Sequence, residues 1–240
     1  MDYGVQMYSV RDVTEKDMEK ALKAVSDIGY RFVEFAGFFG HPAAEIKAML
    51  NHYGLKVSGT HTGWQEVAEH FDETVAYHKA IGNANIIVPG ADLSSQEKID
   101  AYVQMANEFQ PKLAAEGITF GYHNHHREFL PNEDGSMIHE QLQTRTNLLL
   151  EIDTYWAYVA GQDPVALMEK LKDRVKVIHI KDGDQEGHGA YLGKGTAPVA
   201  AVYQKAVELG IPMVVESETL TPDGITEVRE CFQYLKSLEK

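Results

Sequence analysis

The sequence predicts an α/β fold, a single (β/α)8 TIM barrel that extends over residues 1–240. The chain's 240 residues are the usual length of one such barrel. No linker rich in serine, glycine or proline divides the chain, so we expect one domain. Short apolar or β-branched runs recur along its whole length, and amphipathic stretches fill the gaps, which is the pattern of repeated βα units.

Eight of these runs are candidate strands, and each is as short as the staves of a barrel are. They lie at residues 5–9, 32–36, 56–60, 86–89, 119–124, 148–153, 175–181 and 213–217. An amphipathic stretch follows each run, so we count eight βα pairs.

Helix ends are marked by capping residues and glycines. Thr14, followed by acidic residues at positions 15 and 17, resembles the N-cap of the first helix. Several expected helices end at a glycine that a strand follows within a few residues, as C′ glycines do. These are Gly29, Gly54, Gly82, Gly117 and Gly210. The repeated order of helix, glycine and strand favours a barrel over an open sheet.

A doubly wound open sheet is the alternative fold. It would ordinarily carry a glycine-rich phosphate-binding turn after its first strand. The segment YSVRD at residues 8–12 is not such a turn. No nucleotide-binding fingerprint therefore supports the alternative.

Composition and charge exclude several classes of partner. The 22 basic and 36 acidic side chains give a net charge of -14, which repels phosphate backbones, so we expect no nucleic-acid partner. No apolar run approaches the roughly 20 residues that span a bilayer, so we expect no membrane partner. The first residues, MDYGVQ, lack the basic and apolar regions of a secretory signal, and we expect a cytoplasmic location.

Three of the expected strands end with a carboxylate or an imidazole. Asp153 closes the sixth run, His179 lies near the end of the seventh, and Glu216 lies near the end of the eighth. Taken alone, Asp153 could cap the next helix and His179 could be a hydrogen-bonded core residue. A carboxylate at Glu216 must be paired, hydrated or metal-bound. Because the C-terminal ends of parallel staves converge, the three together predict a divalent-metal site.

Two carboxylates and one imidazole suit a hard or borderline dication. Manganese is the ion that we expect, with Mg²⁺, Co²⁺ or Zn²⁺ as alternatives. A fourth ligand is expected from the polar segment FGYHNHHREF at residues 120–129, where His123 and His125 share one strand face and Glu128 lies just beyond. His123 is the predicted fourth ligand, and Glu128 is the open alternative.

Other strand ends supply candidates for binding a substrate. Gln6 belongs to the first strand, Glu34 to the second, and His61 ends the third. Trp156 lies after the sixth strand, where its ring could cover the apolar face of a sugar or pack against the next helix. The glycine-rich segment at residues 187–195 is expected to form a flexible lid or substrate clamp.

The combined motifs resemble the xylose isomerase-like barrel superfamily, whose members are commonly called sugar phosphate isomerases/epimerases. The resemblance covers nearly the whole chain. It rests on GVQMYSVRD at residues 4–12, IGYRFVEFAG at 28–37, YHNH at 122–125, EIDTYWA at 151–157, AGQDP at 160–164, HIKD at 179–182 and Glu216 after Val215.

This resemblance implies a divalent metal held by a glutamate, an aspartate, a histidine and a second glutamate from strands five to eight. Asp153, His179 and Glu216 match the last three positions. The chain departs at the first position, where His123 stands, or Gly121 under a shifted alignment. One acid/base residue of the family's two-glutamate mechanism is therefore missing or displaced.

The resemblance also implies an activity. In such enzymes the metal holds the carbonyl and adjacent hydroxyl oxygens of an open-chain ketose, and a base removes the proton between them to give a metal-stabilised enediolate. Glu216, Glu128 and His125 are the candidate bases, and Lys181 is a candidate acid. The predicted function is a metal-dependent isomerase or epimerase of a keto-sugar or sugar derivative.

Three other functions remain open from the sequence. The same enolate could expel a β-hydroxyl, which would make the protein a dehydratase or lyase on a keto-sugar or inosose. A non-catalytic sugar-binding barrel is the second. An abasic-site endonuclease, the third, is disfavoured by the net charge of -14 and by Trp156, which stands where that activity would need a further histidine. Because barrels of this superfamily often pair, we also expect a homodimer.

Overall fold

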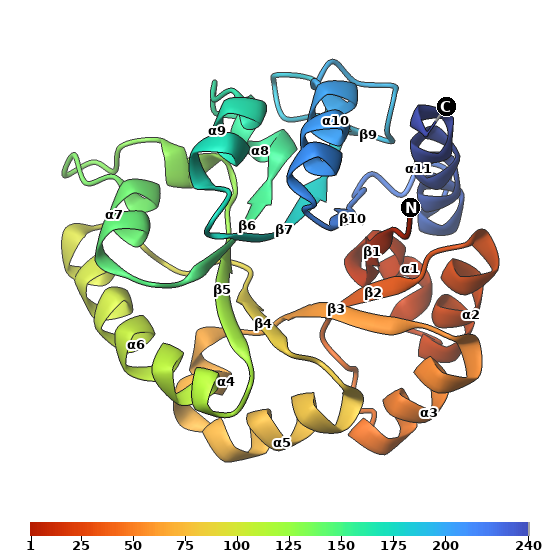
Figure 1. Cartoon of the computed structure of the whole chain (residues 1–240), viewed down its shortest axis with the longest axis horizontal. Coiled ribbons are helices and arrows are strands. Elements are labelled where there is room, and N and C mark those ends of the chain that lie inside the picture. Colours follow the sequence, from red (N-terminus) through yellow and green to blue (C-terminus); the bar gives the residue numbers. More distant parts are fainter. Residues whose placement is uncertain (240) are drawn as a thin grey trace.

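The computed structural model describes residues 1–239, in which eight parallel strands close into a barrel (Figure 1). The strands are β1 (Gly4–Gln6), β2 (Phe32–Ala36), β3 (Lys56–His61), β4 (Asn85–Val88), β5 (Thr119–His123), β6 (Leu149–Asp153), β7 (Val175–Ile180) and β10 (Met213–Val215). Each strand pairs with its neighbours in sequence, and β1 pairs with β10 to close the ring. The predicted (β/α)8 fold is confirmed.

Helices surround the strands on the outside of the barrel (Figure 1). They are α1 (Arg11–Thr14), α2 (Met18–Ile28), α3 (Ala43–Tyr53), α4 (Trp64–Glu69), α5 (Phe71–Ile81), α6 (Gln96–Ala115), α7 (Ile138–Arg145), α8 (Thr154–Val159), α9 (Pro164–Leu171), α10 (Val199–Leu209) and α11 (Gly224–Leu238). Two short 3-10 helices, η1 (Met7–Val10) and η2 (His126–Phe129), follow β1 and β5. A small hairpin, β8 (Asp182–Gly183) with β9 (Gly189–Ala190), follows β7. None of the helices in residues 1–239 combines the length and the apolar content that crossing a membrane requires.

Two local predictions near the N-terminus are wrong. The first strand ends at Gln6 instead of continuing to residue 9, because the Gln6 side chain accepts a hydrogen bond from the Tyr8 backbone N–H and caps η1. Thr14 is not an N-cap, since it is the last residue of α1 and its hydroxyl donates to the carbonyl of Val10, at the end of η1. Asp17 caps α2 instead, by accepting a hydrogen bond from the backbone N–H of Lys20.

The barrel interior changes from apolar to polar along its axis. Ile87, Val177 and Val214 form a buried apolar layer across the middle of the barrel. On the side of the N-terminal strand ends, Val177 and Val214 also line an apolar cavity of about 330 Å³. On the other side lie the carboxylates and imidazoles of the strand ends. The fold therefore places the polar candidates together at the mouth where active sites of TIM barrels lie.

Candidate metal centre

Four side chains that end neighbouring strands converge at the mouth of the barrel. They are His123 at the end of β5, Asp153 at the end of β6, His179 on β7 and Glu216 directly after β10. All four are buried, with at most 5% of each residue exposed. One potential ligand atom from each lies within 4.8 Å of those from the other three.

The distances within this group suit ligands that share one ion. His123 Nε2 is 3.6 Å from Asp153 Oδ2. His179 Nδ1 is 3.3 Å from Glu216 Oε2. Among the described residues, both ring nitrogens of His123, Oδ2 of Asp153 and Nδ1 of His179 are buried and have no hydrogen-bond partner. Leaving such atoms unpaired costs about 1–3 kcal/mol each, and a cation bound between them would remove that cost.

The donor set fits a divalent ion. Two imidazole nitrogens and two carboxylate oxygens are ligands that Mn²⁺, Co²⁺ and Zn²⁺ all accept, and no thiolate is present to favour a structural zinc. Burial, with the nearby His179 and His61, holds the pKa of His123 well below its usual value. His123 is therefore neutral at pH 7, which is the form that binds a metal.

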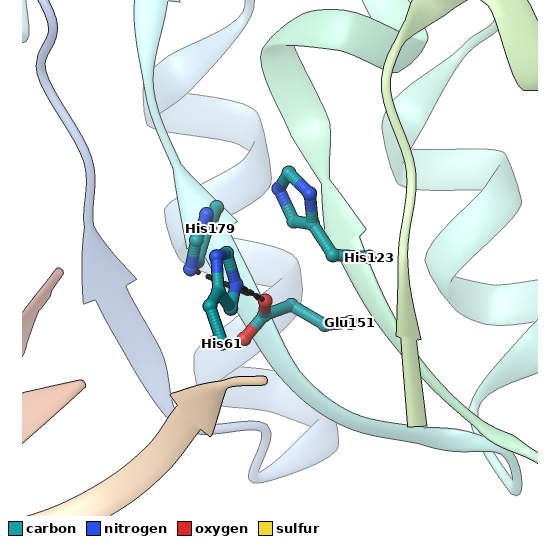
Figure 2. Close-up of side chains that lie close together, drawn as sticks. All are labelled: His61, His123, Glu151 and His179. Atoms are coloured by element: carbon teal, nitrogen blue, oxygen red, sulfur yellow. Dashed lines mark hydrogen bonds and ion pairs between the residues drawn. The ribbon is translucent and has the colours of Figure 1, made fainter. Parts of the chain in front are cut away.

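A second group of side chains lies deeper in the barrel. Figure 2 shows His61, Glu151, His179 and His123 pointing toward one another from β3, β6, β7 and β5, and potential ligand atoms of these four also lie within 4.8 Å. Here, however, hydrogen bonds already occupy one facing atom each of His61, Glu151 and His179. His61 Nε2 is 2.7 Å from Glu151 Oε2, and His179 Nε2 is 2.7 Å from Glu34 Oε1. In the upper group the facing atoms of His123, Asp153 and His179 are unpaired, and only Glu216 Oε2 has a partner, Lys181, so it is the better metal site.

Glu34 and Glu151 are two buried carboxyl groups with opposite pKa shifts. Burial opposes ionisation of Glu34, but the charges of His179 and His61, with hydrogen bonds to His179 and Glu151, lower its pKa to about 2. Burial and the adjacent Glu34 charge raise the pKa of Glu151 to about 8. The opposite pKa shifts follow from the proximity of the two carboxyl groups, because two adjacent buried carboxylates do not ionise together readily.

Lys181 brings a positive charge to the edge of the upper group. Its Nζ lies 3.3 Å from Glu216 Oε2 and 4.0 Å from Asp153 Oδ2, and it also contacts the Glu218 carboxylate. The ammonium is 4.8 Å from the ring centroid of Trp156. Although burial opposes its charge, the carboxylates of Glu216, Asp153 and Glu218 raise the pKa of Lys181. Lys181 is thus a charged acid held beside the proposed ligands.

A cavity of about 400 Å³ opens onto the upper group. Its lining residues are Tyr8, Ala36, His61, Pro89, His123, His125, Glu216 and Glu218. Neither lysine nor arginine is among them. The cavity is large enough for a small sugar, and its walls offer imidazoles, carboxylates and one aromatic ring.

Of the residues predicted to bind substrate, Gln6, Glu34 and Trp156 do not line this cavity, and the predicted base Glu128 lies apart from it as well. Glu128 is buried behind β5, where it accepts hydrogen bonds from the Tyr122 hydroxyl and the His125 backbone N–H. Tyr122 and His123 are consecutive in β5 and so face opposite sides of the sheet. Gln6 does not line the cavity either, since its amide donates to Glu34 Oε1 at 2.7 Å.

Glu151 and Glu218 are polar neighbours of the centre, and neither was predicted to belong to it. Glu151 shares its strand face with Asp153, and Glu218 stands two residues after Glu216. This two-residue spacing is the signal that could have identified them.

The segment after β7 is anchored. The Asp182 carboxylate accepts hydrogen bonds from four backbone N–H groups, those of Gly183, Gly193, Gly195 and Ala197, at 2.8–3.2 Å. Asp182 is buried. One carboxylate therefore anchors residues 193–197 beside the end of β7, and a flexible lid or substrate clamp at residues 187–195 stays a prediction.

Comparisons with known proteins agree with the fold. A family model described as a xylose isomerase-like TIM barrel matches residues 22–238. A sugar phosphate isomerase/epimerase from Parabacteroides distasonis has a similar structure, with a TM-score of 0.85, 26% identity and coverage of 97% of this chain and 96% of that one. A probable 3-DHS dehydratase, AsbF from Bacillus anthracis, shares the fold, with a TM-score of 0.77, 12% identity and coverage of 98% and 99%.

A curated relative is more distant. The rhizopine catabolism protein MocC of Rhizobium meliloti is 20% identical over 190 residues, which are 69% of this chain and 57% of that protein. The chain therefore matches little more than half the length of this relative.

Proposed function

The chain belongs to the xylose isomerase-like TIM barrel family, and from that premise we propose that it is a metal-dependent isomerase or epimerase of a keto-sugar. The observation that carries the proposal is the upper group, His123, Asp153, His179 and Glu216, whose facing atoms are buried, close together and largely unpaired. The proposed ion is Mn²⁺, for which this mixture of imidazole and carboxylate ligands is suited.

The cavity supports a small, uncharged substrate. A solved structure similar to this chain is called a sugar phosphate isomerase/epimerase. In this chain the cavity lining includes the carboxylates of Glu216 and Glu218 and lacks lysine and arginine, so a phosphate group there would meet like charges. We therefore propose an unphosphorylated keto-sugar.

A bound ion would activate the substrate, and side chains of the protein would move the proton. A dication held by the upper group would polarise a carbonyl and acidify the neighbouring carbon-bound proton. Glu216 lines the cavity, and although burial opposes its charge, Lys181 and His179 hold its pKa well below the usual value. Glu216 is therefore ionised at neutral pH and able to accept a proton. Glu218 and His125 also line the cavity and are the further candidate bases.

Lys181 is the candidate acid of this chain. It lies beside Glu216 and Glu218 with its charge retained and would donate to a substrate oxygen, whereas the proton that Glu216 removes from one carbon would return from Glu216 to the neighbouring carbon. Glu128 takes no part in the proposed proton transfer, because both of its oxygens are engaged behind β5.

A dehydratase on a keto-sugar or inosose is the second candidate function. The observation that favours it is the replacement of the strand-five glutamate by His123, which leaves the upper group without the second glutamate of an epimerase pair. Loss of a β-hydroxyl needs one base and one acid for the leaving group, and Glu216 with Lys181 could supply them.

Metal content and solvent exchange test the proposal. Purified protein should contain close to one equivalent of dication by elemental analysis. Asp153→Asn should lower that content at least tenfold, since an amide is a far poorer ligand than a carboxylate. The control is Asp163→Asn, another helix-capping aspartate, which is exposed at the start of α9 and should leave the content unchanged. Equal metal content in both variants would remove Asp153 from the site.

Incubation in heavy water with ketohexoses, 3-keto sugars and inosose then separates the activities. Deuterium at carbon with recovery of an isomer supports the isomerase or epimerase. Loss of water supports the dehydratase. Tight sugar binding with neither outcome would refute catalysis and leave a sugar-binding barrel.

A further inference from the structure

The two ring nitrogens of His179 have different surroundings. Nε2 is 2.7 Å from Glu34 Oε1, in hydrogen-bond contact. Nδ1 faces Glu216 Oε2 at 3.3 Å without forming a hydrogen bond. His179 is fully buried. Because a histidine nitrogen binds a metal only through a free lone pair, the partner of Nε2 decides which nitrogen can be a ligand.

Glu34 is itself held on several sides. The Gln6 side-chain amide donates to its Oε1 at 2.7 Å, and His61 Nε2 is 3.2 Å from the same oxygen. Gly59 leaves the room that Glu34 needs, since a Cβ at that position would lie 3.0 Å from Glu34 Oε2. Glu34 is fully buried and does not line the cavity of about 400 Å³. The predicted role of Glu34 in binding the substrate therefore lacks the contact that it needs.

We propose that Glu34 is a positioning residue of the metal centre. Glu34 would accept a hydrogen bond from the Nε2–H of His179. This bond would fix the tautomer and the ring orientation in which Nδ1 faces the ion. Gln6 and His61 hold Glu34 in place for this task. Carboxylates that accept a hydrogen bond from a ligating histidine act in this way, and their loss commonly weakens metal binding 10- to 100-fold. The inference rests on the metal site of the proposed function.

A direct role of Glu34 as a ligand fits the geometry less well. Glu34 belongs to neither of the two groups whose ligand atoms lie within 4.8 Å of one another in residues 1–239. Its Oε1 already faces three nitrogens, those of Gln6, His61 and His179.

Metal affinity measured on metal-free protein tests the proposal without any assay of activity. In Glu34→Gln the amide can turn its NH₂ toward His179 Nε2, which would move the ring proton to Nδ1 and block the ligand. We expect the Kd for Mn²⁺, followed by the electron paramagnetic resonance of free Mn²⁺, to rise about 10- to 100-fold. Glu34→Asp keeps the charge but moves the carboxylate away from His179 by the length of one methylene, so a smaller rise in the Kd for Mn²⁺ is expected.

The matched control is Glu128→Gln. It is the same substitution at a glutamate that is also buried, in η2 after β5, and bonded to Tyr122 and His125 instead of to His179. Its Mn²⁺ affinity should stay within about twofold of wild type. Circular dichroism of each metal-free variant checks the fold, and if Glu34→Gln does not fold, Glu34→Asp alone decides.

A second readout reports on the bond itself. In the Co²⁺-loaded wild-type protein, the proton on His179 Nε2 should give a strongly shifted NMR signal that exchanges slowly with water. In Glu34→Gln this signal should be lost or should exchange much faster. His179→Ala identifies the signal.

The outcomes separate the two claims. Unchanged Mn²⁺ affinity in folded Glu34 variants, or an equal loss in Glu128→Gln, would overturn the positioning role while leaving the metal centre intact. No Mn²⁺ binding by wild type, or binding that Asp153→Asn does not weaken, would overturn the proposed function and this inference together.

Discussion

Asp153 uses its two carboxylate oxygens for different purposes. Oδ1 accepts a hydrogen bond from the Trp156 backbone N–H at 2.8 Å and caps α8. Oδ2 has no partner and faces His123. The cap fixes the side-chain rotamer, so the second oxygen is aimed into the upper group without further support. Asp153 can therefore cap the next helix and serve as a metal ligand at the same time, which are the two roles that the sequence left open.

Removing the charge of Lys181 should change metal affinity and turnover in opposite directions. Its ammonium competes with an ion for Glu216 and Asp153, and two unit charges 4 Å apart interact by about 4 kcal/mol at an effective dielectric constant of ~20. Lys181→Met should therefore tighten Mn²⁺ binding on the order of tenfold while turnover falls, because a proton donor is lost.

Titration of the metal-free variant with Mn²⁺, next to its turnover with the active sugar, checks this prediction. Lys205→Met, on α10 and paired with Glu169 and Glu208 away from the mouth, is the control and should change neither quantity. Weaker Mn²⁺ binding in Lys181→Met would show that the lysine supports the ligands instead of competing with the ion.

Which residues meet at the centre could be inferred from the sequence, but their partners could not. Asp153, His179 and Glu216 end apolar runs, and period-two alternation turns them inward. The sequence shows which side of a strand a group faces, but it shows neither its depth nor its neighbours. For that reason the bonds of Glu34 with His179 and of Glu128 with Tyr122 were not predicted.

At the scale of elements, a buried polar network joins β3 to α5. His78 Nδ1 on α5 is 3.3 Å from Thr60 Oγ1 on β3 and 3.0 Å from the side-chain nitrogen of Asn83. Burial lowers the pKa of His78 to about 4. The network therefore holds a neutral histidine, and protonation of His78 would break it.

This network predicts acid sensitivity. Between pH 6.5 and 4 the unfolded chain takes up a proton at His78 and the native protein does not, so stability that is present above pH 6.5 is lost as the pH falls toward 4. The slope is up to about 1.4 kcal/mol per pH unit for one such group. Urea unfolding of metal-free protein at several pH values measures this. Between pH 6.5 and 4, the free energy of unfolding should fall less steeply in His78→Gln than in wild type.

The exposed His52 of α3 provides the comparison. His52→Gln should leave the pH dependence of stability as it is in wild type. If the free energy of unfolding of wild type and of His78→Gln has the same slope against pH, the fold does not keep His78 neutral.

Element boundaries could be predicted where one signal dominates. Gly54 ends α3 in the left-handed conformation with φ of 65°, as expected of a C′ glycine. Near the N-terminus, Thr14 and Asp17 are both good capping residues only three positions apart, and local composition does not decide between them. The contact of Thr14 with Val10 does.

For the whole molecule, a metal held by four strands should stabilise the closed barrel. The proposed ligands come from β5, β6, β7 and the end of β10, so an ion would bind the native state only. Free Mn²⁺ at 100 times its Kd should add about 2.7 kcal/mol, or roughly 5–10 °C in the Tm of a chain of this size.

Differential scanning calorimetry with Mn²⁺ and with a chelator measures this rise in Tm. In Asp153→Asn, Mn²⁺ should raise the Tm little. An equal Tm for wild type with and without Mn²⁺ would contradict binding to the folded barrel.

Closure of the barrel could be predicted from the repeated order of helix, glycine and strand together with the lack of a phosphate-binding turn, because that turn is what an open doubly wound sheet would carry. The net charge of -14 likewise needs no structure. A homodimer and a cytoplasmic location stay predictions. The anchoring of the segment after β7 by Asp182 lay beyond the sequence, because it joins a carboxylate to backbone groups up to 15 residues away.

The apolar layer of Ile87, Val177 and Val214 divides the barrel into two compartments. The cavity lined by Met213 and Phe32 and the one above the metal centre have no lining residue in common. A small hydrophobic compound lodged in the lower compartment would thus leave turnover untouched. Probes that bind this protein in a screen can accordingly be sorted by whether sugar displaces them.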